Sequence, residues 1–211
     1  VSGAKALQVV QPLFKGSGEL AKLQSHTAHY GQITDPSNQA IIDQALFLIM
    51  KAPRTYTGED VVEIQTHGSP LVLEKVLSLL VKQGARLAVP GEFTRRAFLL
   101  GKIDLAQAEA VMEIITAENW DHHGWALSQL KGSLSTRVGS LRERLLGVLA
   151  HIEASIDFSE EGILFWTHSE MSEEITSVSE EVERLLAGYN EGRKLREGFT
   201  VVIIGRPNVG K

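Results

Sequence analysis

The chain has 211 residues, 43% of them hydrophobic and 22% charged, and its net charge is −5. These values fit a globular protein of one or two domains, and the acidic balance excludes a basic surface over the whole protein while allowing a local basic patch. The absence of cysteine excludes disulfides, thiol nucleophiles and thiolate metal sites. With no apolar run near the ~20 residues of a bilayer span, we expect a cytoplasmic protein without membrane contact.

The first hundred residues alternate between helix and strand patterns. Helical spacing of apolar residues predicts a helix over residues 4–14. Two apolar stretches predict strands over 26–34 and 40–50, joined by an Asp-Pro-Ser-Asn turn at 35–38. Another strand is predicted over 61–66, so this zone is expected to form a mixed α/β domain.

A further helix is predicted over 71–82. Ser69 is a good N-cap, Pro70 suits the first helical position and Gly84 suits the end of the helix. The short stretch 86–89 that follows is predicted to be one more strand.

Residues from about 103 to 197 have a helical pattern. A first helix is predicted over 121–158, about 55 Å long at ~1.5 Å per residue, and a second around 175–189. Each carries one apolar face, and two helices cannot bury both faces alone. We therefore expect a third partner, either a helix over 104–118 or residues beyond 211.

Four polar side chains lie within nine positions in and around the strand predicted over 61–66: Glu59, Asp60, Glu63 and His67. A carboxylate on a strand with apolar neighbours could bind an amine-bearing ring. The residues alone favour a simpler interpretation, a turn with solvated acids before an edge strand. His67 precedes a glycine and fits a loop residue better than a metal ligand.

A second polar segment precedes the helical zone. Gly101 is predicted to end a helix rich in arginine and aromatic residues, and Asp104 to cap the next one, so that Lys102 projects from the junction. The spacing leaves two alternatives open. In the first, Asp104 only caps the helix while Arg95 or Arg96 pairs with a surface acid; in the second, the junction is an anion or ligand site.

Two adjacent histidines, His122 and His123, lie between Trp120 and Trp125. Neighbouring residues on a helix point to different faces, so this pair does not favour a metal site.

The final residues 205–211 read Gly-x-x-x-x-Gly-Lys, the pattern of a phosphate-binding loop. A predicted buried strand over 199–204 precedes it, the context that the motif requires. Glycines allow backbone N–H groups to approach phosphate oxygens, and Lys211 would reach the β- and γ-phosphates. We expect a chain cut where a nucleotide-binding domain begins; the loop alone does not distinguish GTP from ATP.

Five sequence blocks in this order resemble the MnmE (TrmE) family of tRNA-modification GTPases, and the resemblance covers essentially the whole chain. The blocks are 57–61, 90–94, 97–99, 102–110 and 205–211.

The resemblance implies a fold that is α/β plus all-α. Residues 1–102 would form a folate-binding and dimerisation domain, 103–197 the first part of an elongated helical domain, and 198–211 the first strand and P-loop of a Ras-like GTPase domain. Family members act as homodimers with the partner protein MnmG. They add an aminomethyl-type group at C5 of the wobble uridine of certain tRNAs, using a tetrahydrofolate one-carbon donor such as 5-formyl-tetrahydrofolate.

The resemblance also implies site residues. Glu63 matches a glutamate that contacts the folate pterin, and Lys102 matches a lysine that also contacts folate. A third folate contact in the family is an arginine immediately before the position of Val1.

The nucleotide site would be formed by Asn208, Val209, Gly210 and Lys211. Asn208 matches the asparagine that binds a potassium ion through its carbonyl oxygen, in a family that hydrolyses GTP to GDP with K⁺ and Mg²⁺.

Several family elements are absent from this sequence: the Mg²⁺-binding Ser/Thr, both switch regions, the guanine-reading Asn-Lys-x-Asp motif and a C-terminal Cys-x-Gly-Lys. We therefore expect no catalytic residue in this fragment and no GTP hydrolysis by it alone. Two alternatives stay open: a folate-binding module fused to another P-loop NTPase, and a dimerisation scaffold without a ligand.

Overall fold

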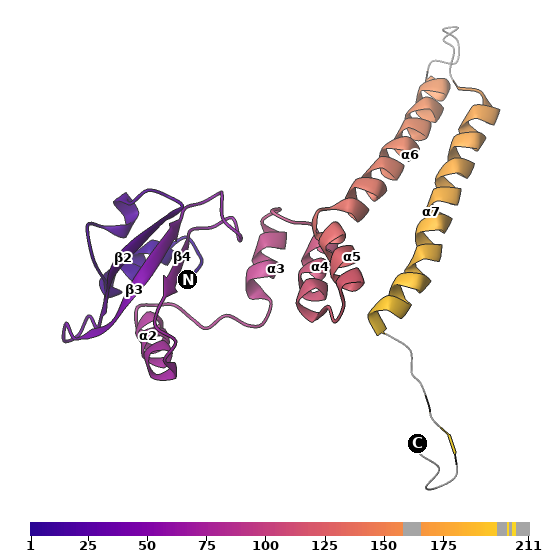
Figure 1. Ribbon diagram of the computed structural model, residues 1–211. Coiled ribbons are helices and arrows are strands. Elements are labelled where there is room, and N and C mark those ends of the chain that lie inside the picture. Colours follow the sequence, from indigo (N-terminus) through magenta and orange to yellow (C-terminus); the bar gives the residue numbers. More distant parts are fainter. Residues whose placement is uncertain (158–165, 198–201, 203, 206–211) are drawn as a thin grey trace. The chain divides into compact units, whose positions relative to one another are not determined.

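The computed structural model describes residues 1–157, 166–197, 202 and 204–205, and divides the chain into two compact units, Val1–Ala108 and Glu109–Lys211 (Figure 1). We call these the N-terminal unit and the helical unit, and describe each by itself.

The N-terminal unit contains a four-stranded antiparallel sheet in the order β1-β2-β3-β4, together with short helices that precede and follow it. Its elements in chain order are α1 (Ala6–Val10), η1 (Gln11–Leu13), β1 (Phe14–Lys15), η2 (Leu20–Lys22), β2 (Thr27–Thr34), β3 (Ile41–Met50), β4 (Val61–Gln65), α2 (Pro70–Lys82) and α3 (Glu92–Leu99). The mixed α/β prediction is therefore confirmed for this unit.

One face of the sheet builds the hydrophobic core. Alternate residues of the strands point to the same face, so Ile33, Phe47, Ile49 and Val62 are fully buried together. The ring of Phe14 packs edge-on against Phe47, with centroids 4.7 Å apart. Residues of α1, η1 and α2 complete this core: Ala6, Val10, Leu13, Val76, Leu79 and Leu80.

The outward face of the sheet carries the other set of side chains. Across it, Tyr30 lies opposite Leu46, Leu46 opposite Gln65, and Leu48 opposite Glu63. Tyr30, Leu46 and Glu63 are exposed, which places Glu63 on the open face of the sheet.

Most predicted elements of this unit are confirmed, but two are wrong in part. The helix predicted over 4–14 ends at Val10 and continues as η1 and β1. The strand predicted over 86–89 is not formed, because the N–H of Val89 donates to the carboxylate of Glu92 instead of joining the sheet.

The helical unit does not contain the single helix predicted over 121–158. Two helices, α5 (Trp120–Leu130) and α6 (Ser133–Asp157), take its place. Gly132 between them has φ of +85°, a left-handed conformation that ends an α-helix. The 25 residues of α6 span only about 38 Å.

The remaining helices are α4 (Leu105–Thr116), inside which the boundary between the units falls, and α7 (His168–Glu197). Within the helical unit α5 contacts both α6 and α7 and is a third partner for them, a role that was predicted for a helix over 104–118 or for residues beyond 211. Among the described residues, no helix combines the length and the apolar character needed to cross a membrane.

The helices α6 and α7 are joined by a charged cluster and by apolar contacts. Arg144 donates hydrogen bonds to Glu174, Glu181 and Ser177 of α7. An apolar groove of about 540 Å³ runs beside this contact. Its lining includes Val138, Leu145, Leu149, Val182 and Leu186, all of which are largely exposed.

Candidate functional site

The loop between β3 and β4 contains the first polar motif. We call residues 53–60 the 53–60 loop. Thr55 Oγ1 donates a hydrogen bond to the Glu59 carbonyl oxygen (2.6 Å) and accepts one from the Gly58 N–H (2.9 Å). The loop is therefore closed by its own side chain and presents a defined backbone.

The start of the chain pairs with this loop and with β4. The buried hydroxyl of Thr57 lies 2.8 Å from the hydroxyl of Ser2, and the Gly3 N–H donates to the Asp60 carbonyl oxygen. Residues 1–3 therefore extend the sheet beyond β4 and fix the end of the 53–60 loop.

Lys102 lies directly on the 53–60 loop. Gly101, with φ of +67°, ends α3, and the Lys102 N–H donates to the Ala97 carbonyl oxygen. The Lys102 Nζ then donates to the Pro53 carbonyl oxygen at 2.9 Å. Its methylene groups would lie 3.2–3.3 Å from a Cβ at Gly58, whose φ is +84°. The left-handed backbone favours glycine at position 58, and the lysine methylenes leave little room there for a Cβ.

Glu63 lies on β4, the strand that directly follows the loop, and its exposed carboxylate is directed away from the core. The Val1 amine donates to the Val62 carbonyl oxygen at 2.8 Å. Within the described part of the chain, no hydrogen bond or ion pair joins Glu63 to Lys102.

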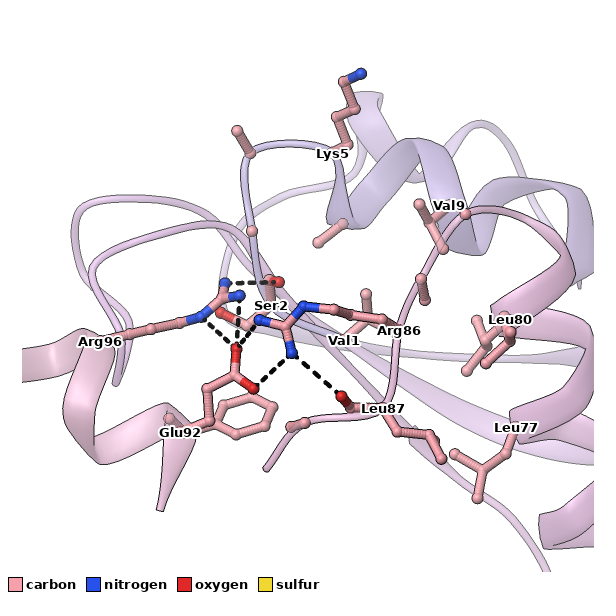
Figure 2. A pocket seen from close by; sticks show the side chains of 18 residues that line it. Val1, Ser2, Lys5, Val9, Leu77, Leu80, Arg86, Leu87, Glu92 and Arg96 are labelled. Atoms are coloured by element: carbon pink, nitrogen blue, oxygen red, sulfur yellow. Dashed lines mark hydrogen bonds and ion pairs between the residues drawn. The ribbon is translucent and has the colours of Figure 1, made fainter. Parts of the chain in front are cut away.

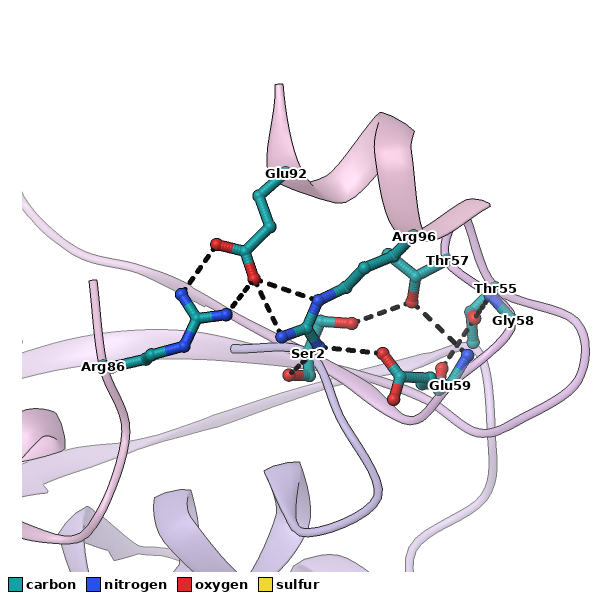
Figure 3. Close-up of polar contacts among 8 residues, drawn as sticks. All are labelled: Ser2, Thr55, Thr57, Gly58, Glu59, Arg86, Glu92 and Arg96. Atoms are coloured by element: carbon teal, nitrogen blue, oxygen red, sulfur yellow. Dashed lines mark hydrogen bonds and ion pairs between the residues drawn. The ribbon is translucent and has the colours of Figure 1, made fainter. Parts of the chain in front are cut away.

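The second polar motif is built around the carboxylate of Glu92, which is only 8% exposed (Figures 2 and 3). Arg86 Nη1 donates to Glu92 Oε2 at 2.8 Å, the Val89 N–H donates to the same oxygen at 3.0 Å, and Arg96 Nη2 donates to Oε1 at 2.8 Å. These bonds, that from Arg86 first, lower the pKa of Glu92 to about 2. Glu92 is therefore a buried anion fully compensated by cations and a backbone donor.

Arg96 connects the second motif to the first. Its Nη1 donates to Glu59 Oε2 at 2.9 Å and its guanidinium also bonds Glu92 (Figure 3). From the sequence, one alternative was that Arg95 or Arg96 pairs with a surface acid. Arg96 has instead a buried acid and a loop acid, and neither Glu92 nor Arg86 was identified. The i,i+4 spacing of Glu92 and Arg96 was the one available signal.

A cavity of about 490 Å³ lies beside Glu92, between the start of the chain and α2 (Figure 2). Apolar side chains such as Val9, Leu77, Leu80 and Phe93 form much of its lining. Neither Glu63 nor Lys102 belongs to that lining, so the cavity is distinct from the predicted folate residues.

The other polar residues of the first motif have separate partners. Asp60 Oδ1 accepts a hydrogen bond from the Ala52 N–H, and the His67 ring lies 2.8 Å from Asp43, a residue that sequence analysis did not identify. Glu59, Asp60, Glu63 and His67 are therefore not one cluster.

The two histidines of α5 contact different groups. The buried His122 ring lies 2.8 Å from the carboxylate of Glu113, whereas His123 packs against Trp120. At the N-terminus of α4, Asp104 accepts from the Gln107 N–H as the predicted N-cap. The predicted nucleotide residues, Asn208, Val209, Gly210 and Lys211, lie outside the described residues, as does most of the strand over 199–204.

Comparison with known proteins extends over both units. Residues 1–102 match the family model described as "GTP-binding protein TrmE N-terminus", and residues 105–200 match "MnmE helical domain". Relatives named "tRNA modification GTPase MnmE" from Acetivibrio thermocellus, Carboxydothermus hydrogenoformans and Bacillus subtilis are 44%, 48% and 45% identical to the chain.

These alignments cover 100% of the chain but only 46%, 46% and 47% of the respective relatives, so the chain spans about half the length of the curated relatives that it matches. The two family models match successive segments of the chain, first the TrmE N-terminus and then the MnmE helical domain. The chain therefore belongs to the MnmE (TrmE) family, of which it comprises the N-terminal and helical parts.

Proposed function

We propose that this chain is the folate-binding and helical portion of a GTP-hydrolysing enzyme that modifies tRNA. The name of the relatives, which are 44–48% identical over the whole chain, supports the GTPase and the tRNA substrate. In this proposal the complete protein acts in the cytoplasm as a homodimer with MnmG. It adds a carboxymethylaminomethyl-type group at C5 of the wobble uridine, with a tetrahydrofolate derivative as one-carbon donor.

The main support for the folate site comes from Glu63 and Lys102, the two residues at the positions that the family resemblance assigns to folate. Both have polar groups available to a ligand. Glu63 presents an exposed carboxylate on the outward face of β4, with no hydrogen bond to another described residue, and it is suited to accept hydrogen bonds from pterin N–H groups. The Lys102 ammonium uses one donor for Pro53 and has no second partner among the described residues, so it has donors left for a ligand.

The position of Val1 beside β4 also supports this site. In the family, the third folate contact is an arginine immediately before this position. Val1 exchanges backbone hydrogen bonds with Val62, the residue directly before Glu63. The preceding position therefore adjoins Glu63, where an arginine could contact the same ligand.

The nucleotide site of the complete protein would use Asn208, Val209, Gly210 and Lys211. Backbone N–H groups of this loop and the Lys211 ammonium would bind the phosphates of GTP. The side-chain carbonyl of Asn208 would hold K⁺, while Mg²⁺ would take its Ser/Thr ligand from outside this chain. Together the ions would offset charge on the phosphates during hydrolysis.

The test is calorimetric titration of the complete protein with 5-formyl-tetrahydrofolate. We expect binding that weakens at least about tenfold in both Glu63→Ala and Lys102→Ala, because each loses a charge-assisted hydrogen bond. Glu74→Ala and Lys82→Ala are matched controls, since both side chains are exposed on α2 of the same unit, and their affinity should equal that of the wild type.

Two results would contradict the folate site. Unchanged affinity in Glu63→Ala and Lys102→Ala would remove these residues from it. Failure of the folded wild type to bind would leave the ligand-free scaffold as the better account of the N-terminal unit.

A further inference from the structure

Two polar motifs of the N-terminal unit do not themselves contribute a ligand contact to the proposed folate site. One is the 53–60 loop with Glu59, and the other is the segment with Arg86, Glu92 and Arg96. They lie 37 residues apart in sequence at Glu59 and Arg96, yet an ion pair joins them (Figure 3).

The contacts form a continuous chain of charges that runs Arg86–Glu92–Arg96–Glu59. Glu92 is its buried centre, and the two arginines bond both of its oxygens. Arg96 and Glu59 are 32% and 28% exposed at their side chains and lie 2.9 Å apart. A pair that is partly shielded and anchored at a buried carboxylate holds its geometry better than an exposed surface pair.

The same loop carries Lys102. Glu59 directly follows Gly58, the residue whose missing Cβ makes room for the Lys102 methylenes. Pro53, at the other end of the loop, accepts the hydrogen bond from Lys102 Nζ. A shift of the loop at Glu59 would therefore move both surfaces on which the lysine rests.

We propose that Glu59 and Arg96 are positioning residues for Lys102. By tying the 53–60 loop to α3, they hold the ammonium group where the polar groups of a bound folate meet it. This inference rests on the proposed folate site. It adds that affinity for the ligand depends on an ion pair that does not itself touch the ligand.

A double-mutant cycle in the complete protein distinguishes positioning from plain structural support. Glu59→Gln keeps the shape of the side chain and leaves Glu92 with both arginines, whereas loss of Arg96 would expose the buried carboxylate and endanger the fold. We expect Glu59→Gln to weaken 5-formyl-tetrahydrofolate binding about fivefold when Lys102 is present, and less than about twofold in the Lys102→Gln background.

Glu174→Gln is the matched control. Glu174 is also bonded to an arginine, Arg144, and is 28% exposed like Glu59, but it belongs to the helical unit. Its replacement should leave folate affinity unchanged.

A second readout needs no ligand. In Glu59→Gln the Lys102 ammonium should lose its fixed place against Pro53. Acetylation of Lys102, measured by peptide mass spectrometry relative to the exposed Lys82, should become at least about twofold faster.

The outcomes separate the two proposals. No folate binding by the wild type would defeat the folate site, while faster acetylation of Lys102 in Glu59→Gln would still support the positioning role. Equal losses of affinity in both Lys102 backgrounds, with unchanged acetylation, would overturn the positioning role and leave the folate site intact.

Discussion

The N-terminal unit contains a core of fully buried apolar side chains, whereas α6 and α7 of the helical unit leave most of their apolar side chains exposed. Leu13, Phe47 and Ile49 are fully buried in the first, but Leu145 and Leu186 are 44% and 64% exposed in the second. A sheet closed by helices on one face makes a core by itself, while two long helices with a third packed at one place do not.

The two units therefore differ in what stabilises them and in what kind of site they can support. In the N-terminal unit the polar network of Glu59, Glu92 and Arg96 is added to a closed core, so it can fix a ligand site on a stable frame. In the helical unit, the apolar groove beside Leu145 and Val182 is open. The helices α6 and α7 are therefore held together by fewer apolar contacts and by the Arg144 cluster.

The largest expected effect comes from replacing one leucine in each unit with alanine. Leu13→Ala, at a fully buried site, should destabilise the N-terminal unit by about 2–5 kcal/mol, whereas Leu145→Ala should cost less than about 1 kcal/mol. All three tryptophans lie in the helical unit, so their fluorescence reports its urea unfolding alone.

For Leu13→Ala, the transition seen by far-UV circular dichroism should shift while the tryptophan transition stays in place. Equal costs for the two leucines would contradict the contrast between a closed core and an open helical face.

Acid should destabilise the N-terminal unit through its hydrogen-bonded carboxylates. The folded-state pKa of Glu92 is lowered from 4.5 to about 2, so its ionised form stabilises the fold above pH 4.5, and this contribution disappears as the pH falls towards 2. Hydrogen bonds from Lys75 and Ser37 lower the pKa of Asp35 in the same direction.

We expect the thermal midpoint of the N-terminal unit to fall over this pH range, and the slope to be smaller in Glu92→Gln, which lacks the titrating group. Circular dichroism melts between pH 7 and pH 2.5 provide the measurement. Parallel curves for wild type and variant would show that Glu92 is not held as a buried anion.

The smallest expected effects on stability come from replacing one glycine in each unit with alanine. Gly58→Ala should destabilise the N-terminal unit by about 1–2 kcal/mol, because its φ of +84° is left-handed, and the new methyl group would also press on Lys102. Gly147→Ala, inside α6 with open space around it, should instead stabilise the helical unit by about 0.5–1 kcal/mol.

Urea unfolding by circular dichroism and tryptophan fluorescence distinguishes these effects. Folate affinity should fall in Gly58→Ala and stay constant in Gly147→Ala. The same sign of effect on stability at both positions would contradict the account.

Local signals made much of the N-terminal fold predictable. The alternation in β2 and β3, the turn at 35–38 and the Ser69-Pro70 start of α2 each lie within a few residues, and the structure confirms them. The helix break at Gly132 was missed because a glycine inside a helical apolar pattern does not by itself show which backbone conformation it takes.

The polar network could not be predicted, because its partners are distant in sequence. The strand predicted over 86–89 failed since Val89 bonds a side chain, Glu92, that nothing local marks as buried. Arg96 and Glu59 are 37 positions apart, a distance over which local periodicity gives no information. The residues alone left a ligand-binding role for Glu63 and Lys102 as one of two alternatives, and only the resemblance to a family assigned both to a folate site.

The most direct test of the folate site is a crystal structure of the complete protein with 5-formyl-tetrahydrofolate. The account predicts the pterin within hydrogen-bonding distance of the Glu63 carboxylate, with the Lys102 ammonium, still resting on the 53–60 loop, bonded to another polar group of the ligand. A ligand that fills the cavity beside Arg86 and Glu92 instead, without touching Glu63 or Lys102, would contradict it.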